Sequence, residues 1–449
     1  MPRIMADSAR RCTGGFTALL FAVLLAVLGA AAGAARAADP PRAADWSEEA
    51  RLADFDRFVH DFGDNYAYPE RDEKPWLTWA DRYKPAVLAA QSAESYAAVI
   101  EAALDELHDF HAEVRAHNPH RWLPVPTFAD IWASEDVHGA AVIAVRHGSD
   151  AERVGIVPGD HVTAIGKLPV AAAISARLTA YVDNRSLPAR NWALLSVLAG
   201  RADEVRQLSV RDRNGRVREL TLPLERRFDR PPGELASGLL PDGIGWIRFN
   251  NSIGDIGTVA AFDRALEQLR GAPGLVLDLR DVPSGGDSSV ALGILGRLVK
   301  SMLPYQHHRI PNYGRSDIER NWFEYVAPRG PFTYQAPIVV LVDHWTGSMG
   351  EGMAIGLDGM KRALVVGTPM AHLAGAVSDF TLPRTGIDVA YATEQLYHVN
   401  GTPRQDWLPP VLVAEGAATS DASDAAADPI MSRGVEELQR LIAQSRKQD

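Results

Sequence analysis

The sequence predicts an α/β protein, and three observations lead to this fold class. Strand and helix patterns alternate through residues 229–415, which is typical of a largely parallel sheet with helices packed on it. Residues 121–228 instead hold short strand patterns joined by turn signals, and they predict a compact, mostly β module. Residues 38–120 carry apolar side chains at three- and four-residue spacing, the pattern of amphipathic helices.

The composition and charge of the chain argue against two classes of protein, disordered chains and nucleic-acid binders. The chain has 449 residues, 46% of them hydrophobic and 23% charged, which excludes wholesale disorder. This length predicts two or three domains. Acidic residues outnumber basic ones by 57 to 46, for a formal net charge of −11. That balance argues against a protein that binds nucleic acid by neutralising its phosphates.

Residues 1–37 form a pattern of their own. Three arginines precede the apolar run FTALLFAVLLAVLGAAAGAA, and small residues in A-x-A form end at Ala37. We therefore expect a secretory signal peptide cleaved after Ala37, and an exported protein, periplasmic or secreted, with no stable membrane insertion after cleavage. An uncleaved anchor helix is the alternative, but the A-x-A site favours cleavage. The one cysteine, Cys12, would leave with the signal, so neither disulfides nor cysteine metal ligands are expected.

The pattern of each part predicts its elements. The helical segment should hold helices over residues 47–62 and 92–111. In the β module, GAAVIAV at residues 139–145 predicts a strand, and two later strands flank the hairpin signal Asn214-Gly215. The core should alternate four strands with three helices, and its strand GLVLDLRD is apolar enough to be covered on both faces. Residues 416–449 predict a loose linker and a terminal amphipathic helix.

Ser348 stands where a buried strand runs into a helix, in the stretch IVVLVDHWTGSMGEGMAIGL. Free backbone N–H groups and the helix dipole at such a turn favour an anion, as a serine nucleophile with an oxyanion site requires. Serine is also a good helix cap, and this stretch alone leaves both interpretations open. It is not the hydrolase motif G-x-S-x-G, because Thr346 stands at the first glycine position.

Two other stretches contain residue types suited to a site. Ser284-Gly285-Gly286 follows a buried strand, where paired glycines can turn N–H groups toward a ligand or simply form a β-α turn. Phosphate-loop and dinucleotide-binding motifs are absent. The stretch LHDFHAEVRAHNPH offers histidines for a base or a metal site. H-E-x-x-H is missing, so the metal signal is weak. The histidines are His108, His111, His117 and His120.

Three strings together resemble the tail-specific (carboxyl-terminal processing) serine peptidases and their relative, the tricorn core protease. They are DLRDVPSGG, HWTGSMGEGMAIGL and RHGSDAERVGIVPGDHVTAIGKLPV, in the order found in that family. The resemblance implies a crotonase/Clp-protease-like catalytic core (229–415), an N-terminal helical segment (38–120) and an inserted PDZ-like module (121–228). It implies hydrolysis of protein or peptide substrates without a metal or another cofactor. A PDZ module would hold a peptide's carboxyl end, here near residues 138–142.

The resemblance also implies roles for individual residues. Ser348 is the expected nucleophile, and the N–H groups of Met349 and of Gly286 (or Gly285) are the expected oxyanion donors. Tail-specific proteases use a lysine base, but its position here falls on Leu373. Lys361 comes too early in the chain to replace it, so a Ser-Lys pair is not expected.

The tricorn-like branch uses a histidine that precedes the PDZ module, and LHDFH resembles its L-x-D-x-H string. This implies His111 as the base, with His372 as the rival. That branch also has a late acidic residue on the histidine side, where Gln405-Asp406 stand here, so Asp406 is the candidate orienting acid. Glu351 matches the family string and is expected to be a supporting residue.

Three functions are compatible with these patterns. The favoured one is an exported serine peptidase with Ser348 and His111 at its centre. The second is a catalytically silent relative that binds peptides or apolar ligands, which the missing lysine would allow. The third is a metal-dependent hydrolase built on the stretch from His108 to His120. Neither the substrate's identity nor the oligomeric state follows from the sequence.

Overall fold

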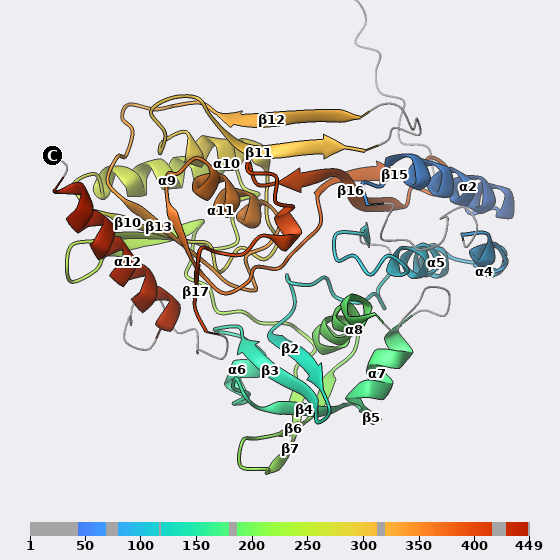
Figure 1. The fold of residues 1–449 in the computed structure, drawn as a ribbon. Helices are drawn as coiled ribbons and strands as arrows, with labels where there is room; N and C mark the ends of the chain where they lie inside the picture. Colours follow the sequence, from blue (N-terminus) through green and yellow to red (C-terminus); the bar gives the residue numbers. More distant parts are fainter. Residues whose placement is uncertain are drawn as a thin grey trace, which may run out of the picture. The chain divides into compact units, whose positions relative to one another are not determined.

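The core segment folds around a six-stranded, mostly parallel sheet, as the alternation of strands and helices predicts (Figure 1). In spatial order the strands are β17 (Val411–Leu412), β14 (Leu364–Gly367), β13 (Ile338–Val342), β10 (Leu275–Asp278), β9 (Gly245–Phe249) and β8 (Leu235–Leu239). β8 pairs with β9 antiparallel, and the other four pairs are parallel. The predicted α/β class is confirmed.

The computed structural model describes residues 44–68, 80–115, 118–178, 186–311, 319–414 and 428–447. The predicted signal peptide with Cys12, the predicted linker and His117 lie outside the described residues. Residues 46–449 belong to one structural unit.

Helices cover both faces of the six-stranded sheet. One face packs on α9 (Gly257–Gln268), α10 (Ser288–Leu295) and α11 (Met349–Gly359), and the other on α12 (Pro429–Ser445). Successive residues of β10 divide between the faces: Leu277 belongs to the first cluster and Val276 to the second. Each such buried aliphatic side chain contributes roughly 1.5–3 kcal/mol relative to exposure. The continuous apolar run of this strand is thereby explained.

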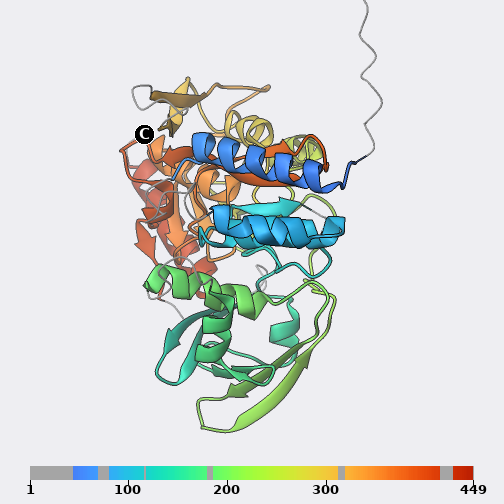
Figure 2. The ribbon, with the colours of Figure 1, turned by 90° about the vertical axis from the view of Figure 1, so that its right-hand side faces the viewer.

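A second sheet brings distant parts of the chain together. Its strands are β1 (Glu113–Arg115), β16 (Asp388–Tyr397), β11 (Leu303–Ile310) and β12 (Arg320–Val326), with β15 (Ala376–Thr381) also paired to β16. Helices α2 (Glu48–Asn65) and α5 (Ala93–Asp105) pack on this sheet (Figure 2). In that cluster the rings of Phe62 and Tyr391 lie 4.8 Å apart. The N-terminal helices therefore hold the chain after α5 beside β15 and β16.

The second predicted helix is shorter than expected. α5 begins after the cap Ser92 but ends at Asp105, and His108 has a φ of 50° that no helix accommodates. His111 therefore lies in a loop rather than on a helix. Among the described residues, the short helices η2 (Asp81–Tyr83) and α4 (Lys84–Ala89) come before α5.

Residues 121–228 form the predicted β module around a core of their own. Its sheet has the order β2 (Ile131–Asp136), β3 (Gly139–Val145), β4 (His161–Ile165), β6 (Arg206–Arg211) and β7 (Val217–Leu222), with β5 (Leu168–Pro169) beside β4. Its helices are α6 (Asp150–Arg153), α7 (Val170–Arg177) and α8 (Leu187–Ala199). The predicted hairpin at Asn214-Gly215 is confirmed, with Gly215 at φ 82°.

The predicted peptide position in this module needs correction. β3, which begins at Gly139, pairs with β2 on one side and β4 on the other, so residues 138–142 offer no open strand edge there. β2 is the terminal strand on the side where α8 packs. The PDZ-like character of the module stays a prediction.

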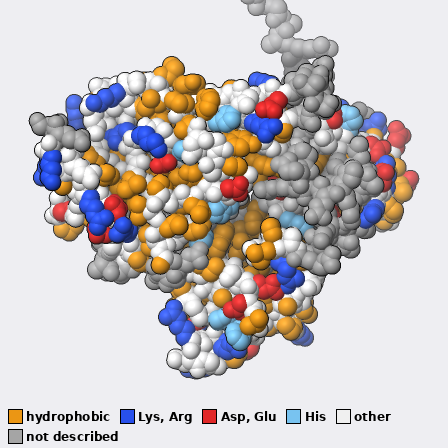
Figure 3. Space-filling view, viewed as in Figure 1, with side chains coloured by type: hydrophobic (Ala, Val, Ile, Leu, Met, Phe, Trp, Pro, Cys, Tyr) orange, Lys and Arg blue, Asp and Glu red, His pale blue; other side chains and the backbone are white. Residues whose placement is uncertain are grey.

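Hydrophobic side chains also appear at the surface. In Figure 3 they gather over β12, where the side chains of Phe323 and Tyr325 are 42% and 50% exposed. Across the described ranges, no helix has both the length and the apolar character needed to cross a membrane.

Candidate active site

Ser348 lies at the turn between β13 and α11, as the sequence pattern predicts. Its φ of 48° and ψ of −112° form a strained backbone conformation for a residue with a side chain. Two buried groups hold the turn: Glu351 Oε2 accepts the Ser348 N–H at 2.8 Å, and Thr346 Oγ1 donates to Leu279 O at 3.1 Å. The nucleophile candidate is thus fixed at the start of a helix and lines a cavity.

The glycine loop after β10 packs directly against Ser348. A Cβ at Gly285, whose φ is 66°, would lie 2.4 Å from the Ser348 Cβ and 2.9 Å from the Met349 nitrogen. A Cβ at Gly286 would lie 2.4 Å from the carbonyl carbon of Ile253. Such contacts are far below van der Waals distance, so both positions require glycine.

Two N–H groups of this turn are available to a ligand. In the part of the chain that the structure describes, the N–H groups of Gly286 and Met349 have no hydrogen-bond partner. The Gly285 N–H instead donates to Val282 O at 3.3 Å. Of the two glycines that the sequence left open, Gly286 is therefore the better candidate for an oxyanion donor.

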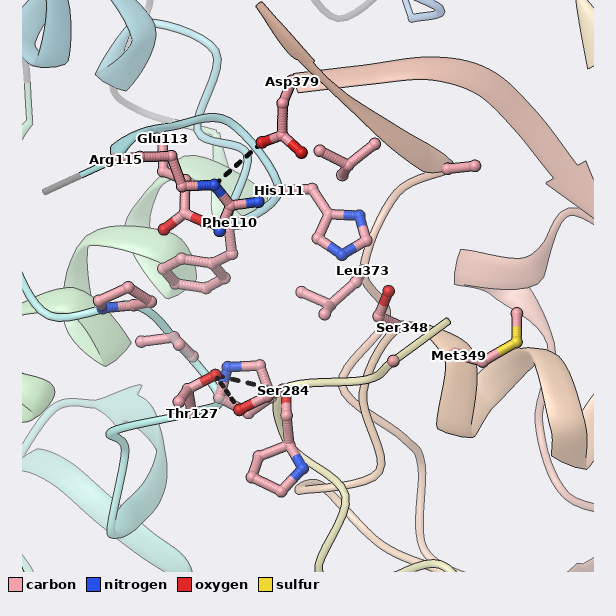
Figure 4. A pocket seen from close by; sticks show the side chains of 18 of the residues that line it. Phe110, His111, Glu113, Arg115, Thr127, Ser284, Ser348, Met349, Leu373 and Asp379 are labelled. Carbon is pink, nitrogen blue, oxygen red and sulfur yellow. Dashed lines mark hydrogen bonds and ion pairs between the residues drawn. The ribbon is translucent and has the colours of Figure 1, made fainter. Parts of the chain in front are cut away.

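His111 reaches the same place from the N-terminal part of the chain. Its Nδ1 lies 2.6 Å from the carbonyl oxygen of Ala374, an acceptor, so Nδ1 carries the proton and Nε2 is left as the basic nitrogen. Burial, helped by the positive charge of Arg404, lowers the pKa of His111 to about 4. The ring is thus neutral at physiological pH. In Figure 4 the His111 ring and the Ser348 hydroxyl point toward one another.

One cavity of about 690 Å³ brings together four of the five predicted site residues: His111, Gly286, Ser348 and Met349. Phe110, Phe128 and Leu373 give its wall apolar surface. Its charged lining residues are Glu113, Arg115, Arg121, Asp287, Asp379 and Arg404. In Figure 4, Leu373 lies beside the gap between His111 and Ser348, and Phe110 lies farther out on the same side. The cavity at Ser348 therefore has both apolar and charged walls.

The fifth predicted residue, Asp406, is not at the cavity. It is exposed on the short helix η3 (Arg404–Asp406), and the partner of His111 Nδ1 is the Ala374 carbonyl. The prediction that a carboxylate orients His111 is corrected accordingly: a backbone carbonyl stands in that place.

The rival bases lie elsewhere. His372 does not line the cavity, and its Nδ1 lies 2.5 Å from the carbonyl oxygen of Gln405. Lys361 is exposed at the end of α11. Leu373 stands at the position where the resemblance would place a lysine base, and it does line the cavity with Ser348.

The predicted histidine cluster is dispersed. His108 packs on the ring of Trp192, and His120 pairs with Asp203. Among the described residues, no three His, Cys, Asp or Glu side chains are grouped as metal ligands. His111 alone of the described three points to the serine.

Glu351 is a buried acid directly behind Ser348. Its Oε2 accepts the N–H groups of Ser348 and Leu373, at 2.8 and 3.3 Å. Burial raises its pKa to about 7, although Arg404 and the backbone N–H groups oppose that shift. It supports the turn, as the sequence predicts, and it does not line the cavity.

The sequence patterns did not single out Arg404, which is fully buried and yet lines the cavity. It stands two residues before Asp406, in the stretch where an acid was expected. The signal that could have found Arg404 was its position: the resemblance pointed to a charged residue in this stretch, and a basic residue there could have been considered as well as an acid.

One stretch of the chain matches a family model, and the fold is similar to solved structures. Residues 243–408 match the model of peptidase family S41. The fold is similar to that of mature CPAF, with a TM-score of 0.58, 16% identity, and coverage of 88% of this chain and 98% of that one. It is also similar to the photosystem II D1 C-terminal processing protease, with a TM-score of 0.53, 17% identity, and coverage of 85% and 99%. No curated protein matches the sequence.

Proposed function

Residues 243–408 match peptidase family S41, and we propose that the chain is a serine-type peptidase with Ser348 as its nucleophile and His111 as its general base. The proposed reaction is hydrolysis of a peptide bond in a protein or peptide substrate. Metal ions and cofactors have no part in the proposal.

In the first step, the Ser348 Oγ attacks the substrate carbonyl carbon while His111 Nε2 takes the hydroxyl proton. The resulting imidazolium keeps its Nδ1–H on the Ala374 carbonyl. It then gives the Nε2 proton to the leaving amine, the C–N bond breaks and an acyl-enzyme remains. Water repeats the sequence, with His111 again as base, and releases the acid product and free Ser348.

The negative oxygen of each tetrahedral intermediate would be held by two backbone donors, the N–H groups of Gly286 and Met349. Such donors stabilise a transition state by about 3–4 kcal/mol each when they are fixed beforehand. Met349 is the first residue of α11, so the positive end of the helix dipole adds to the effect.

The observation that carries this proposal is the relation between His111 and Ser348. They face each other across one cavity, and the Nδ1 hydrogen bond leaves the basic nitrogen of His111 on the serine side. Neither Lys361 nor His372 lines that cavity.

A fluorophosphonate probe tests the proposal, because an activated serine displaces fluoride from phosphorus and stays labelled. Peptide mass spectrometry should find the adduct on Ser348. Labelling should vanish in Ser348→Ala and His111→Ala and persist in Ser378→Ala, a half-buried serine on β15 outside the cavity. Labelling that survives in His111→Ala would exclude His111 as the base. A folded protein that takes no label would favour the silent, ligand-binding relative.

We also propose that the enzyme is exported. The pattern of residues 1–37 supports cleavage after Ala37 and a periplasmic or secreted enzyme. Expression of the full chain followed by N-terminal sequencing should give a new terminus at Ala38. An intact, cytoplasmic chain would contradict this part alone.

A further inference from the structure

Arg404 connects the turn at Ser348 to the segment that precedes β15. Its Nη2 donates to the carbonyl oxygens of Leu373 and Gly375, at 3.0 and 2.7 Å, and its Nη1 lies 3.4 Å from the carbonyl oxygen of Ser348. Only 1% of the residue is exposed. One guanidinium thus holds the backbone of the nucleophile and the backbone beside β15.

The contacts of Arg404 bracket the carbonyl that orients His111. Of three successive carbonyl groups, the outer two, of Leu373 and Gly375, accept from Arg404, and the middle one, of Ala374, accepts from His111. A peptide segment fixed at both flanking carbonyls cannot rotate its middle peptide group freely. Arg404 therefore holds the peptide groups on both sides of the Ala374 carbonyl.

We propose that Arg404 is the positioning residue of this active site, and that it orients His111 through the Ala374 carbonyl in place of a carboxylate. This inference rests on the proposed function, since it assumes that His111 is the base. In this proposal the buried Arg404 has the orienting role that the sequence led us to expect of Asp406.

The charge of Arg404 supports the same role. Among the described residues no carboxylate lies within ion-pair distance of Arg404, and the buried acid that interacts with its charge from farther away is Glu351, on α11. Three charged groups act on His111: Arg404 from η3, Asp109 from its own loop and Arg115 from β1. Further ionised groups of the cavity are Glu113, Arg121, Asp287 and Asp379. Arg404 and Arg115 lower the pKa of His111, and Asp109 raises it.

The test compares the wild type with Arg404→Met, Arg404→Lys and a matched control, Arg362→Met. Arg362 is also an arginine bonded to three backbone carbonyls, those of Leu298, Tyr334 and Ala336, but it does not line the cavity. Two properties are measured: the fluorophosphonate labelling rate against pH, and the tautomer and pKa of His111 by NMR of protein labelled with ¹⁵N-histidine.

The wild type should show His111 as the neutral Nδ1–H tautomer at pH near 7. Arg404→Met should label about 10²-fold more slowly, the loss that a misplacement near 1 Å produces. Its His111 should show mixed tautomers, and the acid limb of its rate profile should move to higher pH, because a positive charge has gone. Arg404→Lys keeps the charge, so its acid limb should stay in place while its rate falls. Arg362→Met should lose stability without changing either property.

Any of three results would overturn the positioning role. The first is a wild-type His111 that carries its proton on Nε2, which can be seen without any variant. The second is a folded Arg404→Met whose tautomer and acid limb match the wild type. The third is an Arg362→Met that changes both properties as much as Arg404→Met does. The proposed function can fail separately. If the wild type takes no label, the peptidase chemistry is refuted. If His111 in that same protein still shows the expected tautomer and loses it in Arg404→Met, the positioning role of Arg404 stands.

Discussion

His111 Nδ1 lies 2.6 Å from the carbonyl oxygen of Ala374, although 263 positions separate the two residues in the chain. The hydrogen bond fixes the tautomer of the ring and leaves Nε2 toward Ser348. It depends on α2 and α5 packing against the sheet that holds β15 and β16. The helical segment therefore helps to form the cavity that His111 and Ser348 line.

Labelling by the fluorophosphonate should be independent of pH through the neutral range and fall only as pH approaches 4. The base must be neutral to accept a proton, and burial lowers the pKa of His111 to about 4. The measurement is the labelling rate from about pH 4 to pH 9. An acid limb near 6.5, the ordinary histidine value, would contradict a buried His111 as base. Glu351→Gln is the control. The pKa of Glu351 is about 7, so this acid is the other group whose ionisation could change the labelling rate near neutral pH, and the variant cannot ionise there.

Glu351→Gln should gain stability over the wild type as pH rises. Burial raises the folded-state pKa of Glu351 from 4.5 to about 7, so the folded protein holds a proton that the unfolded chain has lost in that window. The wild type therefore loses stability between these two pH values, by up to about 3 kcal/mol, and the glutamine variant does not. Urea unfolding at about pH 5 and pH 8 measures this difference. An equal difference between the two proteins at both pH values would refute it.

Gly285→Ala should reduce labelling of Ser348 by about 10²-fold, because the new methyl group would displace the nucleophile. A Cβ there would lie 2.4 Å from the Ser348 Cβ. Gly215→Ala is the matched control: its φ is also positive, at 82°, but nothing lies within 4 Å of the added Cβ. The control should lose only about 1–2 kcal/mol of stability and keep its labelling rate. Equal labelling of both variants would show that the glycine loop does not constrain Ser348.

Arg146→Met should destabilise the protein by about 2 kcal/mol, because Asp281 loses one buried charged hydrogen bond and keeps the ion pair with Arg230 at 3.0 Å. Arg146, at the end of β3, pairs with Asp281 at 2.6 Å, and both side chains are less than 10% exposed. The pair joins the β module to the strand end that precedes the glycine loop. Arg153→Met is the control: Arg153 is 37% exposed and pairs with Asp150 and Asp229, so its loss should cost less than about 1 kcal/mol. Equal costs by urea unfolding would contradict a buried joint.

Local patterns in the sequence were sufficient for most of the elements. The apolar run of β10 predicted a strand covered on both faces, and Asn214-Gly215 predicted its hairpin. The second N-terminal helix ended early at Asp105, because the positive φ of His108 breaks it and spacing alone does not show such a turn. Likewise, the strand 139–145 was predicted, but its pairing on both edges depends on partners far along the chain.

The sequence by itself determined the α/β class, the turn that presents Ser348 and the glycine loop, because each depends on neighbours in the chain. Only the tertiary structure decided what stands behind His111. A backbone carbonyl has no signature in the sequence, since every residue has one, and the peptide groups on both sides of the Ala374 carbonyl are held by Arg404. The expected acid, Asp406, remained at the surface, because packing and not residue type selects which side chain of a short helix faces a cavity.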